Sequence, residues 1–448
     1  MNAAQLLHLY SRAGFGLTTR RLEELLRSED PLAALFPRQV PPMVPAFVST
    51  SELLKLRREI DRTEDRQKRQ QLRLSYRAYR RDTQNLWFEQ LAQGPHDLVE
   101  KMALFWHGHF ACRILDPYDA IEYTNILRTH GLGNFKTLLT KVSQCGAMVD
   151  FLHISKNRKR QPNEDFAREL CELFTLGRDR GYNETDVKEI ARCFTGWTVD
   201  DNRAFYFDSQ QHDEGVKRFM GHSGNFGVED VFDILLSKEA TARFLAEKLH
   251  AYFVHPIRNV REVNELAEQL LKTNYDLGAT MRYLFSAPWF YERHNRGAKI
   301  KSPIELLVGL RKHFDLRPLG KGSWIKLQRS LDQSLYYPPN VGGWPSDQDW
   351  IDASRLAFRL QLPQLLMNNA EVQLAYREDY DANPMERRDE TRSTFRFNCK
   401  VNWTAIAREF YETSELSLPE VLLQKPLPEL VALNAFLKNV ILPFCLLK

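Results

Sequence analysis

The stretch Asn163–Thr198 constrains the fold most, because it carries the start and stop signals of two consecutive short helices. Asn163 can cap the first helix, and Gly177 can end it. Asn183 can cap the second helix, and Gly196 can close it. Apolar residues recur at helical spacing in both segments, at Phe166, Leu170, Leu173 and Phe174, and then at Val187, Ile190, Ala191 and Phe194. The stretch therefore predicts two amphipathic helices.

Helical periodicity of this kind recurs along most of the 448 residues. One short β-hairpin is indicated, because Trp197–Val199 and Phe205–Phe207 alternate around a turn at Asp200–Arg203. We therefore expect a mainly α fold, a large multi-helix globular domain with small β-hairpin insertions.

Changes in composition predict the domain organisation. Residues 1–382 form one helical domain, with a long basic helix within 51–87 and the most distinctive motifs within 96–224. The polar and charged stretch 383–394 predicts a mobile linker or loop. Residues 395–448 predict C-terminal helices that pack on the main domain.

The basic helix has a strong local excess of positive charge. Between Arg57 and Arg81 there are ten Arg or Lys and four Asp or Glu, a net charge of +6 in a chain whose total is +4. An anionic partner such as a phosphate backbone or a lipid surface would suit this helix. A solvated helix with intrahelical ion pairs, such as Glu59 with Arg62, is the favoured interpretation, because few aromatic residues interleave before Tyr76. The small net charge makes nucleic-acid binding unlikely.

Other bulk properties bear on compartment and class. There is no run of about eighteen apolar residues, so we expect no membrane span. Residues 1–16 lack a basic flank followed by an apolar core, which favours a cytoplasmic protein. Six widely spaced cysteines without a C-x-x-C pair indicate neither a zinc ribbon nor a disulfide scaffold.

Two histidines stand in the run Trp106-His107-Gly108-His109-Phe110. On a regular helix, side chains two residues apart point about 200° away from each other and cannot share a ligand. We expect Gly108 to adopt a left-handed conformation that ends the helix and lets His109 turn back toward His107. The alternative is that His107 only caps the C-terminus of the helix.

A carboxylate-rich face lies opposite the apolar residues of the first helix in Asn163–Thr198. Its polar members are Glu164, Arg168, Glu169, Glu172 and Thr175. A glycine-punctuated loop further along carries His212 and Asp213. Loops of this composition often hold functional residues, although Asp and Gly also simply form turns.

Imidazoles and carboxylates together are the usual ligands of Zn, Fe and Mn. We therefore expect a divalent metal site with ligands drawn from His107, His109, Glu169, Glu172 and His212. Glu164, Arg168 and Asp213 are the candidate catalytic residues, with Glu164 as a base and Arg168 holding the nearby carboxylates ionised. Such a site can activate water or bind oxygen, as a hydrolase or an oxygenase-like enzyme does.

Several motifs in a fixed order carry a family resemblance. They are Phe105-Trp106-His107-Gly108-His109-Phe110, the run Asn163–Gly177, Thr195-Gly196-Trp197, residues 212–217, Lys301-Ser302-Pro303-Ile304-Glu305 and residues 338–345. From about Leu6 to Phe358 the chain resembles the bacterial family DUF 1800, a domain of unknown function. The resemblance implies a neighbour, because members are usually encoded beside a protein of DUF 1501 type, and it implies that export is possible.

Two classes of function follow. The first is the metal-dependent enzyme, whose weak point is that the ligand segments have to meet in space. The second is a non-catalytic helical scaffold that binds the DUF 1501-type protein encoded alongside it. An arginine–carboxylate network without any metal would also stabilise buried charges between aromatic residues.

Overall fold

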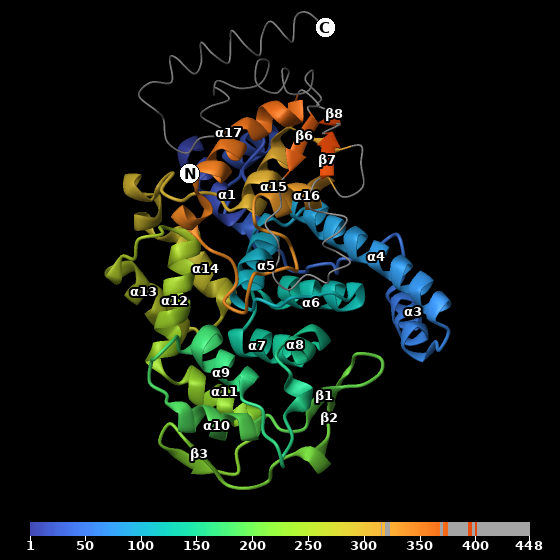
Figure 1. The fold of residues 1–448 in the computed structure, drawn as a ribbon. Coiled ribbons are helices and arrows are strands. Elements are labelled where there is room, and N and C mark those ends of the chain that lie inside the picture. The colour runs from blue at the N-terminus through green and yellow to red at the C-terminus, as the bar shows by residue number, and fades with distance from the viewer. Residues whose placement is uncertain (315, 319–322, 368–370, 375–392, 397–398, 401–448) are drawn as a thin grey trace, which may run out of the picture.

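A computed structural model describes residues 1–314, 316–318, 323–367, 371–374, 393–396 and 399–400. These residues confirm the mainly α fold with small two-stranded antiparallel sheets (Figure 1).

The helices of the first half include those that carry the histidine motif and the run Asn163–Gly177. They are α1 (Ala3–Ala13), α2 (Thr19–Leu26), α3 (Thr50–Arg62), α4 (Arg66–Gln93), α5 (Asp97–His109), α6 (Pro117–His130), α7 (Phe135–Gln144), α8 (Gly146–Phe151), α9 (Asp165–Glu169), the π-helix η3 (Leu170–Thr175) and α10 (Glu184–Cys193). The later helices are α11 (Val228–Leu236), α12 (Glu239–Phe253), α13 (Val260–Lys272), α14 (Leu277–Ser286), α15 (Pro303–Phe314), α16 (Ser323–Ser330) and α17 (Ala353–Met367). Short 3₁₀ turns are η1 (Ala33–Leu35), η2 (Ile154–Lys156), η4 (Ser209–Gln211), η5 (Pro288–Tyr291), η6 (Arg293–Asn295) and η7 (Asp347–Trp350).

Helix α5 forms the centre of the molecule. Every residue from Leu98 to His107 is buried, although a surface helix buries only one stripe of its residues. Helices α1, α4 and α6 pack against it, as Figure 1 shows. The two charged residues in this span, Glu100 and Lys101, are both paired: Glu100 accepts from Arg128 Nε at 2.9 Å, and Lys101 forms an ion pair with Glu305. The polar groups carried by α5 therefore face neighbours from several parts of the chain.

The predicted hairpin is confirmed. Strand β1 (Trp197–Val199) pairs antiparallel with β2 (Phe205–Phe207), with Trp197 opposite Phe207. A second hairpin, β3 (Lys217–Phe219) with β4 (His222–Gly224), lies in the stretch that the sequence indicated only as a loop. Short pairs also join β5 (Arg317–Pro318) to β8 (Cys399–Lys400) and β6 (Glu371–Leu374) to β7 (Ser393–Arg396).

The stretch Asn163–Thr198 is helical as predicted, with two differences in detail. The first helix starts at Asp165, whose N–H donates to the Asn163 side chain at 3.1 Å, and it widens into the π-helix η3. Gly177 ends this segment with a φ of +93°. In the second helix, the Asn183 cap is confirmed, with Asp186 completing a capping box.

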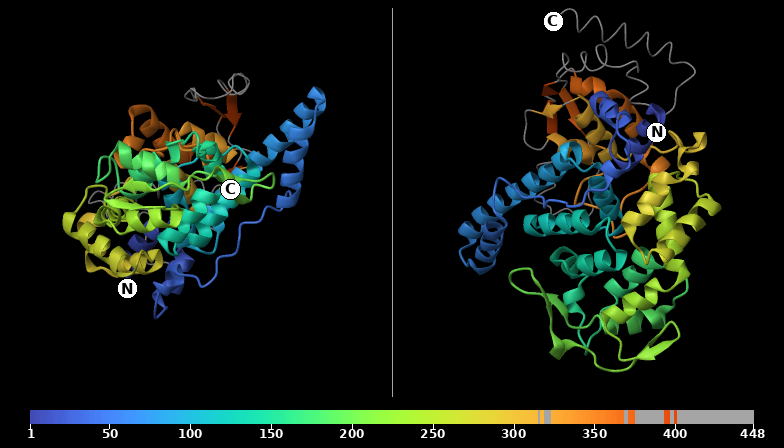
Figure 2. Two further views of the ribbon diagram at one scale, coloured as in Figure 1. Left: turned by 90° about the horizontal axis from the view of Figure 1, so that it is seen from below. Right: turned by 180° about the vertical axis from the view of Figure 1, so that it is seen from behind.

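Helices α3 and α4 form an arm that projects from the body (Figure 1), and the views from below and behind agree (Figure 2). Helix α3 buries only Leu53 and Ile60. The residues of α4 that are buried all lie in its second half, from Thr83 to Ala92. The first half of α4 therefore lies outside the core.

Parts of the expected organisation lie outside the described residues. These are the expected linker at 383–392 and the expected C-terminal helices within 401–448. Residues 393–396, which the sequence assigned to the linker and to the start of the C-terminal helices, form β7 instead. Among the helices that the structure describes, none combines the length and the apolar character that crossing a membrane requires.

Candidate functional site

Helix α5 continues through Gly108 to His109, so the expectation that Gly108 ends the helix was wrong. Gly108 does not have a positive φ, and a Cβ built on it would meet no atom within 4 Å. On an uninterrupted helix, His107 and His109 point in nearly opposite directions. The two imidazoles accordingly have different neighbours.

His107 is fully buried at the side of α5 that faces the segment before α17. Its Nε2 accepts the backbone N–H of Tyr336 at 3.0 Å, so the proton of the neutral ring must be on Nδ1. Burial lowers its pKa to about 3, which keeps the ring neutral. The rings around it are those of Trp87, Tyr123, Tyr336 and Trp344.

The same segment closes tightly over the end of α5. Gly343 has a φ of +85°, and a Cβ at this position would lie 2.5 Å from the carbonyl oxygen of Gly108. Only glycine fits this close approach. The segment from Tyr336 to Trp344 therefore covers His107 directly.

His109 lies on the other side of α5, toward η3 and α12. Its Nε2 donates to the carbonyl oxygen of Phe174 at 3.1 Å, and Phe110, Phe174 and Phe244 are among the rings around it. Burial lowers its pKa to about 3, and the charge of Lys248 lowers it further. His109 does reach the motif helix, which is the segment formed by α9 and η3, but it binds a backbone carbonyl there rather than the carboxylates.

The carboxylates of the motif helix are paired with arginines. Arg168 donates to Glu184 at 2.7 Å and to Glu164 at 3.1 Å, and Glu172 pairs with Arg178. Glu169 is half-buried, and burial together with the charge of Glu172 raises its pKa. This face is therefore the arginine–carboxylate network that the sequence left as the alternative to a metal.

The loop residues His212 and Asp213 also form hydrogen bonds with other residues of the fold. His212 Nδ1 lies 2.8 Å from the carbonyl oxygen of Thr195, and the Asp213 carboxylate accepts two hydrogen bonds from Arg192, at 2.7 and 3.2 Å. Arg192 lowers the pKa of Asp213, mainly through these hydrogen bonds. These contacts fasten the loop to the C-terminal end of α10.

The eight predicted site residues thus fall into four groups rather than one: His107, His109, the residues of the α9–η3 segment, and the loop pair His212 and Asp213. Across the described part of the chain, no three His, Cys, Asp or Glu side chains are grouped so that they could hold a metal ion. The expected convergence of His107, His109 and the motif-helix carboxylates on one cavity is not found.

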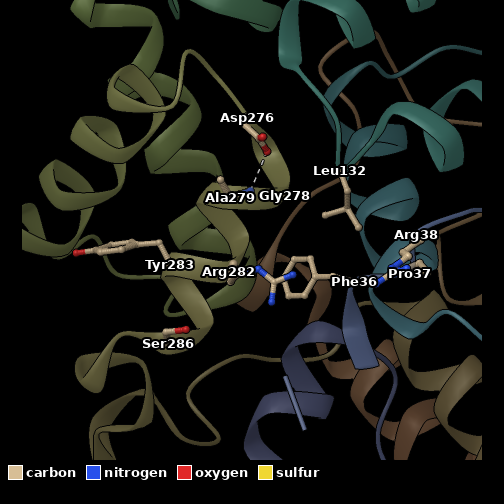
Figure 3. Close-up of a pocket in the computed structure, with 10 residues that line it drawn as sticks. All are labelled: Phe36, Pro37, Arg38, Leu132, Asp276, Gly278, Ala279, Arg282, Tyr283 and Ser286. Atoms are coloured by element: carbon tan, nitrogen blue, oxygen red, sulfur yellow. Dashed lines mark hydrogen bonds between the residues drawn. The ribbon is translucent and has the colours of Figure 1, made fainter. Parts of the chain in front are cut away.

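Two cavities lie elsewhere. The larger, of about 670 Å³, lies between residues 36–38 and α14, and Figure 3 shows the guanidinium of Arg282 over the ring of Phe36. The distance from this guanidinium to the ring centroid is 4.1 Å. Asp276, also at this cavity, is used as the N-cap of α14 and accepts the N–H of Ala279 at 2.8 Å. The exposed cations Arg38 and Arg282 are the charged groups that remain for a ligand.

The smaller cavity, of about 340 Å³, lies along α6 and contains a titratable group that the sequence analysis missed. Glu122 lines it together with Tyr118 and His130, and Oε2 of Glu122 is buried without a hydrogen-bond partner. Burial and the charge of Asp119 raise the pKa of Glu122 to about 7. In the sequence, Glu122 was only one polar residue of a helix, and its depth depends on how α3 lies over α6.

The arm of α3 and α4 is the most strongly charged surface element. Its exposed cations are Lys55, Arg62, Arg66, Lys68, Arg73, Arg77 and Arg81. Contacts to the start of α6 fix the base of the arm: Arg57 pairs with Asp116, and the Tyr76 hydroxyl donates to Asp116 at 2.8 Å. Glu59 pairs with Lys68 across the two helices at 3.0 Å, rather than with Arg62 in its own helix.

Comparison with known proteins places the chain in a family. The family model described as "Protein of unknown function (DUF1800)" matches residues 8–427, which is most of the chain. No curated protein and no solved structure matches it. The extent of the match agrees with the ordered motifs of the sequence, and the chain belongs to the DUF1800 family.

Proposed function

We propose that this protein is a non-catalytic helical scaffold that binds an acidic partner protein through the arm formed by α3 and α4. The observation that carries the proposal is a row of exposed arginines on α4. Arg66, Arg73, Arg77 and Arg81 are exposed and form no ion pair with any residue that the structure describes.

The spacing and length of this row suit a protein interface. The four arginines follow at intervals of seven, four and four residues, so they lie along one side of α4. The segment from Arg66 to Arg81 is about 24 Å long at the helical rise of 1.5 Å per residue. A typical protein interface involves about 20 to 30 residues on each side, which the arm and the adjoining body can supply.

Charge and composition favour a protein over nucleic acid or a membrane. The arm carries a net charge of +6 between Arg57 and Arg81, and the rest of the chain sums to −2, so the positive surface is narrow. Nucleic-acid-binding domains usually have an isoelectric point above about 9, whereas that of this chain is about 8.6. A helix that lies on a membrane needs a large apolar face, whereas Leu74 is the exposed large apolar residue of the described arm.

The family resemblance suggests the partner to test first, namely the DUF 1501-type protein encoded beside such chains. The pairing of most predicted metal-ligand and catalytic residues within the fold supports a scaffold rather than a metal-dependent hydrolase or oxygenase. His107 and His109 bind backbone groups, and Glu164 and Glu172 bind arginines.

The test measures binding of the purified DUF 1501-type protein by titration calorimetry. In the arm variant, Arg66, Arg73, Arg77 and Arg81 are all changed to Glu. The matched control reverses the same number of exposed charges elsewhere, at Arg20, Arg243, Arg261 and Lys272. We expect the arm variant to lose at least tenfold in affinity and the control to bind like the wild type.

Equal affinity of the arm variant and the wild type would contradict the proposal. The proposal would also be contradicted if the wild-type protein did not bind this partner but bound duplex DNA or anionic vesicles through the same arginines. The salt dependence adds a second readout, because arm-mediated binding should weaken as ionic strength rises.

A further inference from the structure

A second buried polar cluster lies beside α5, six residues before His107. Lys101, 2% exposed, forms an ion pair with Glu305 in the first turn of α15. Lys299 shares the same carboxylate oxygen at 3.4 Å, and the N–H of Ser302 donates to the other oxygen at 2.8 Å. The cluster thus joins α5 to the Lys301–Glu305 motif, one of the motifs that carry the family resemblance.

Two arginines complete the cluster. Arg12 of α1, 4% exposed, donates to the carbonyl oxygen of Asn295 at 3.1 Å. Arg359 of α17 donates to the carbonyl oxygen of Lys301 at 2.8 Å. The charge of Glu305 acts on the pKa of each arginine, so both guanidinium groups lie within electrostatic reach of this carboxylate.

The charges in this cluster do not balance. Arg12 and Lys101, which are buried, and Lys299, whose side chain is 9% exposed, face one buried carboxylate, Glu305. Among the residues that the structure describes, this leaves two positive charges. Arg359 and Asp347 are both half-buried and carry opposite charges, so including them leaves the excess at two positive charges. Burying charge without a counter-charge is costly, because the low-dielectric interior cannot replace the lost hydration.

The pKa values of the three cations are lowered by this burial. Burial lowers the pKa of Lys299 to about 8 and that of Arg12 to about 10, and it also lowers the pKa of Lys101. The attraction of Glu305 opposes burial in each case without overcoming it. A further negative charge nearby would stabilise all three cations.

Hydrogen-bond donors also remain unused. Among the residues that the structure describes, four buried atoms have no hydrogen-bond partner: Nε of Arg12, Nε and Nη2 of Arg359 and the hydroxyl oxygen of Tyr252. Tyr252 belongs to the same cluster, because Lys299 donates to its carbonyl oxygen at 2.8 Å and lies 3.8 Å from its ring centroid. Guanidinium groups present donors in a fork that matches the oxygens of phosphate.

We propose that the cluster around Arg12, Lys101, Lys299 and Arg359 is a binding site for a dianionic phosphate group, either free or at the end of a small phosphomonoester. The dianionic form of a phosphate group has a charge of about −2, which matches the excess, and its oxygens accept from the unused donors. Lys301, two residues along the chain from Lys299, is exposed, so the cluster adjoins the surface at this point of the chain.

The full-length chain, dialysed free of phosphate, is titrated with inorganic phosphate and with glycerol 3-phosphate, each at constant ionic strength. Binding is followed by ³¹P NMR line broadening and by the thermal midpoint, with chloride and acetate as reference anions. We expect phosphate to raise Tm by roughly 2 °C or more near saturation. Preference for glycerol 3-phosphate over free phosphate would identify an ester as the ligand.

Two variants locate the site. Arg359→Gln, at the edge of the cluster, should weaken phosphate binding about tenfold, since it removes a charged donor. Arg12→Gln tests the buried side, and if it fails to fold, Arg359→Gln alone decides. Arg282→Gln in the larger cavity is the matched control and should bind phosphate like the wild type. The proposal is overturned if phosphate acts no more strongly than chloride, or if Arg282→Gln loses the binding and Arg359→Gln keeps it.

Discussion

The two ends of α5 bury polar groups in different ways. Near its start, Lys101 lies among other cations with a single carboxylate between them. Near its end, His107 and His109 lie among aromatic rings, and each forms one hydrogen bond to the backbone. A neutral imidazole needs only hydrogen-bond partners, whereas buried charge also needs an opposite charge.

This difference shows where a ligand is needed. The aromatic end carries no unbalanced charge, since both imidazoles are neutral at pH 7, although Nδ1 of each ring is buried and has no hydrogen-bond partner among the described residues. The cationic end keeps an excess of positive charge that the described residues do not neutralise. The histidine motif, which is the more conspicuous of the two in the sequence, is therefore the less promising place to look for a bound anion.

The largest expected effect comes from removing the single carboxylate of the cationic end. Glu305→Gln leaves the three cations without a counter-charge and should lower the free energy of unfolding by about 3–5 kcal/mol. Lys101→Met should cost clearly less, because Glu305 keeps Lys299 as a partner. Urea denaturation of both variants measures the difference, and equal losses would argue against an excess of positive charge.

The aromatic end should respond more weakly. His107→Phe leaves the N–H of Tyr336 without its acceptor and should cost about 1–3 kcal/mol in free energy of unfolding. His222→Ala, at an exposed position of β4, is the control and should change stability by less than about 0.5 kcal/mol.

The same variant has a pH signature. The pKa of His107 is about 3 in the folded protein, below the ordinary value of 6.5, so the unfolded chain binds a proton that the folded chain does not. Stability from this group is present above pH 6.5 and is lost as pH falls toward 3. Between pH 6 and 5, His107→Phe should therefore lose stability less steeply than the wild type, by about 1 kcal/mol per pH unit. Parallel pH profiles would show that the imidazole is not buried as described.

Glu122 is an intermediate case, a single half-buried carboxyl group with one unpartnered oxygen. Its pKa is raised from 4.5 to about 7, so the folded protein holds this proton more tightly, and stability falls as pH rises from 4.5 to 7. Glu122→Gln removes that cost and should increase the free energy of unfolding by about 1–2 kcal/mol above pH 7, with little gain near pH 4.5. Denaturant titrations at pH 5 and pH 8 measure it. An equal effect at both values would indicate an unperturbed carboxyl group.

The exposed arginines of the arm should contribute least to stability. Reversing the charges of Arg66, Arg73, Arg77 and Arg81 should shift Tm only slightly, because exposed charges usually contribute less than about 0.5 kcal/mol each. A large fall in Tm would mean that these side chains pack within the fold, and the arm would no longer be a free surface.

Local signals in the sequence predicted local structure well. The Asn183 cap, the hairpin at residues 197–207 and the mainly helical fold all follow from periodicity, capping and turn residues, which act over a few positions. Gly108 shows the limit of this approach. Glycine permits a left-handed helix end but does not require one, and the packing around α5 decides.

The grouping of charges depends on contacts between residues far apart in the sequence. Lys101 and Glu305 are separated by 204 positions, and their pairing requires the packing of α15 against the central helices. One signal was present, because Glu100 and Lys101 interrupt an otherwise apolar run in α5. Two adjacent charges in such a run indicate buried ion pairs, but their partners cannot be identified from spacing alone.

The most direct test of the proposed function compares three proteins in one binding assay with the DUF 1501-type neighbour: the wild type, the arm variant and His107→Phe. We expect His107→Phe to retain wild-type affinity and the arm variant to lose at least tenfold. The opposite pattern, with affinity lost in His107→Phe and kept in the arm variant, would contradict binding through the arm. It would indicate that the histidine end of α5 carries the function instead.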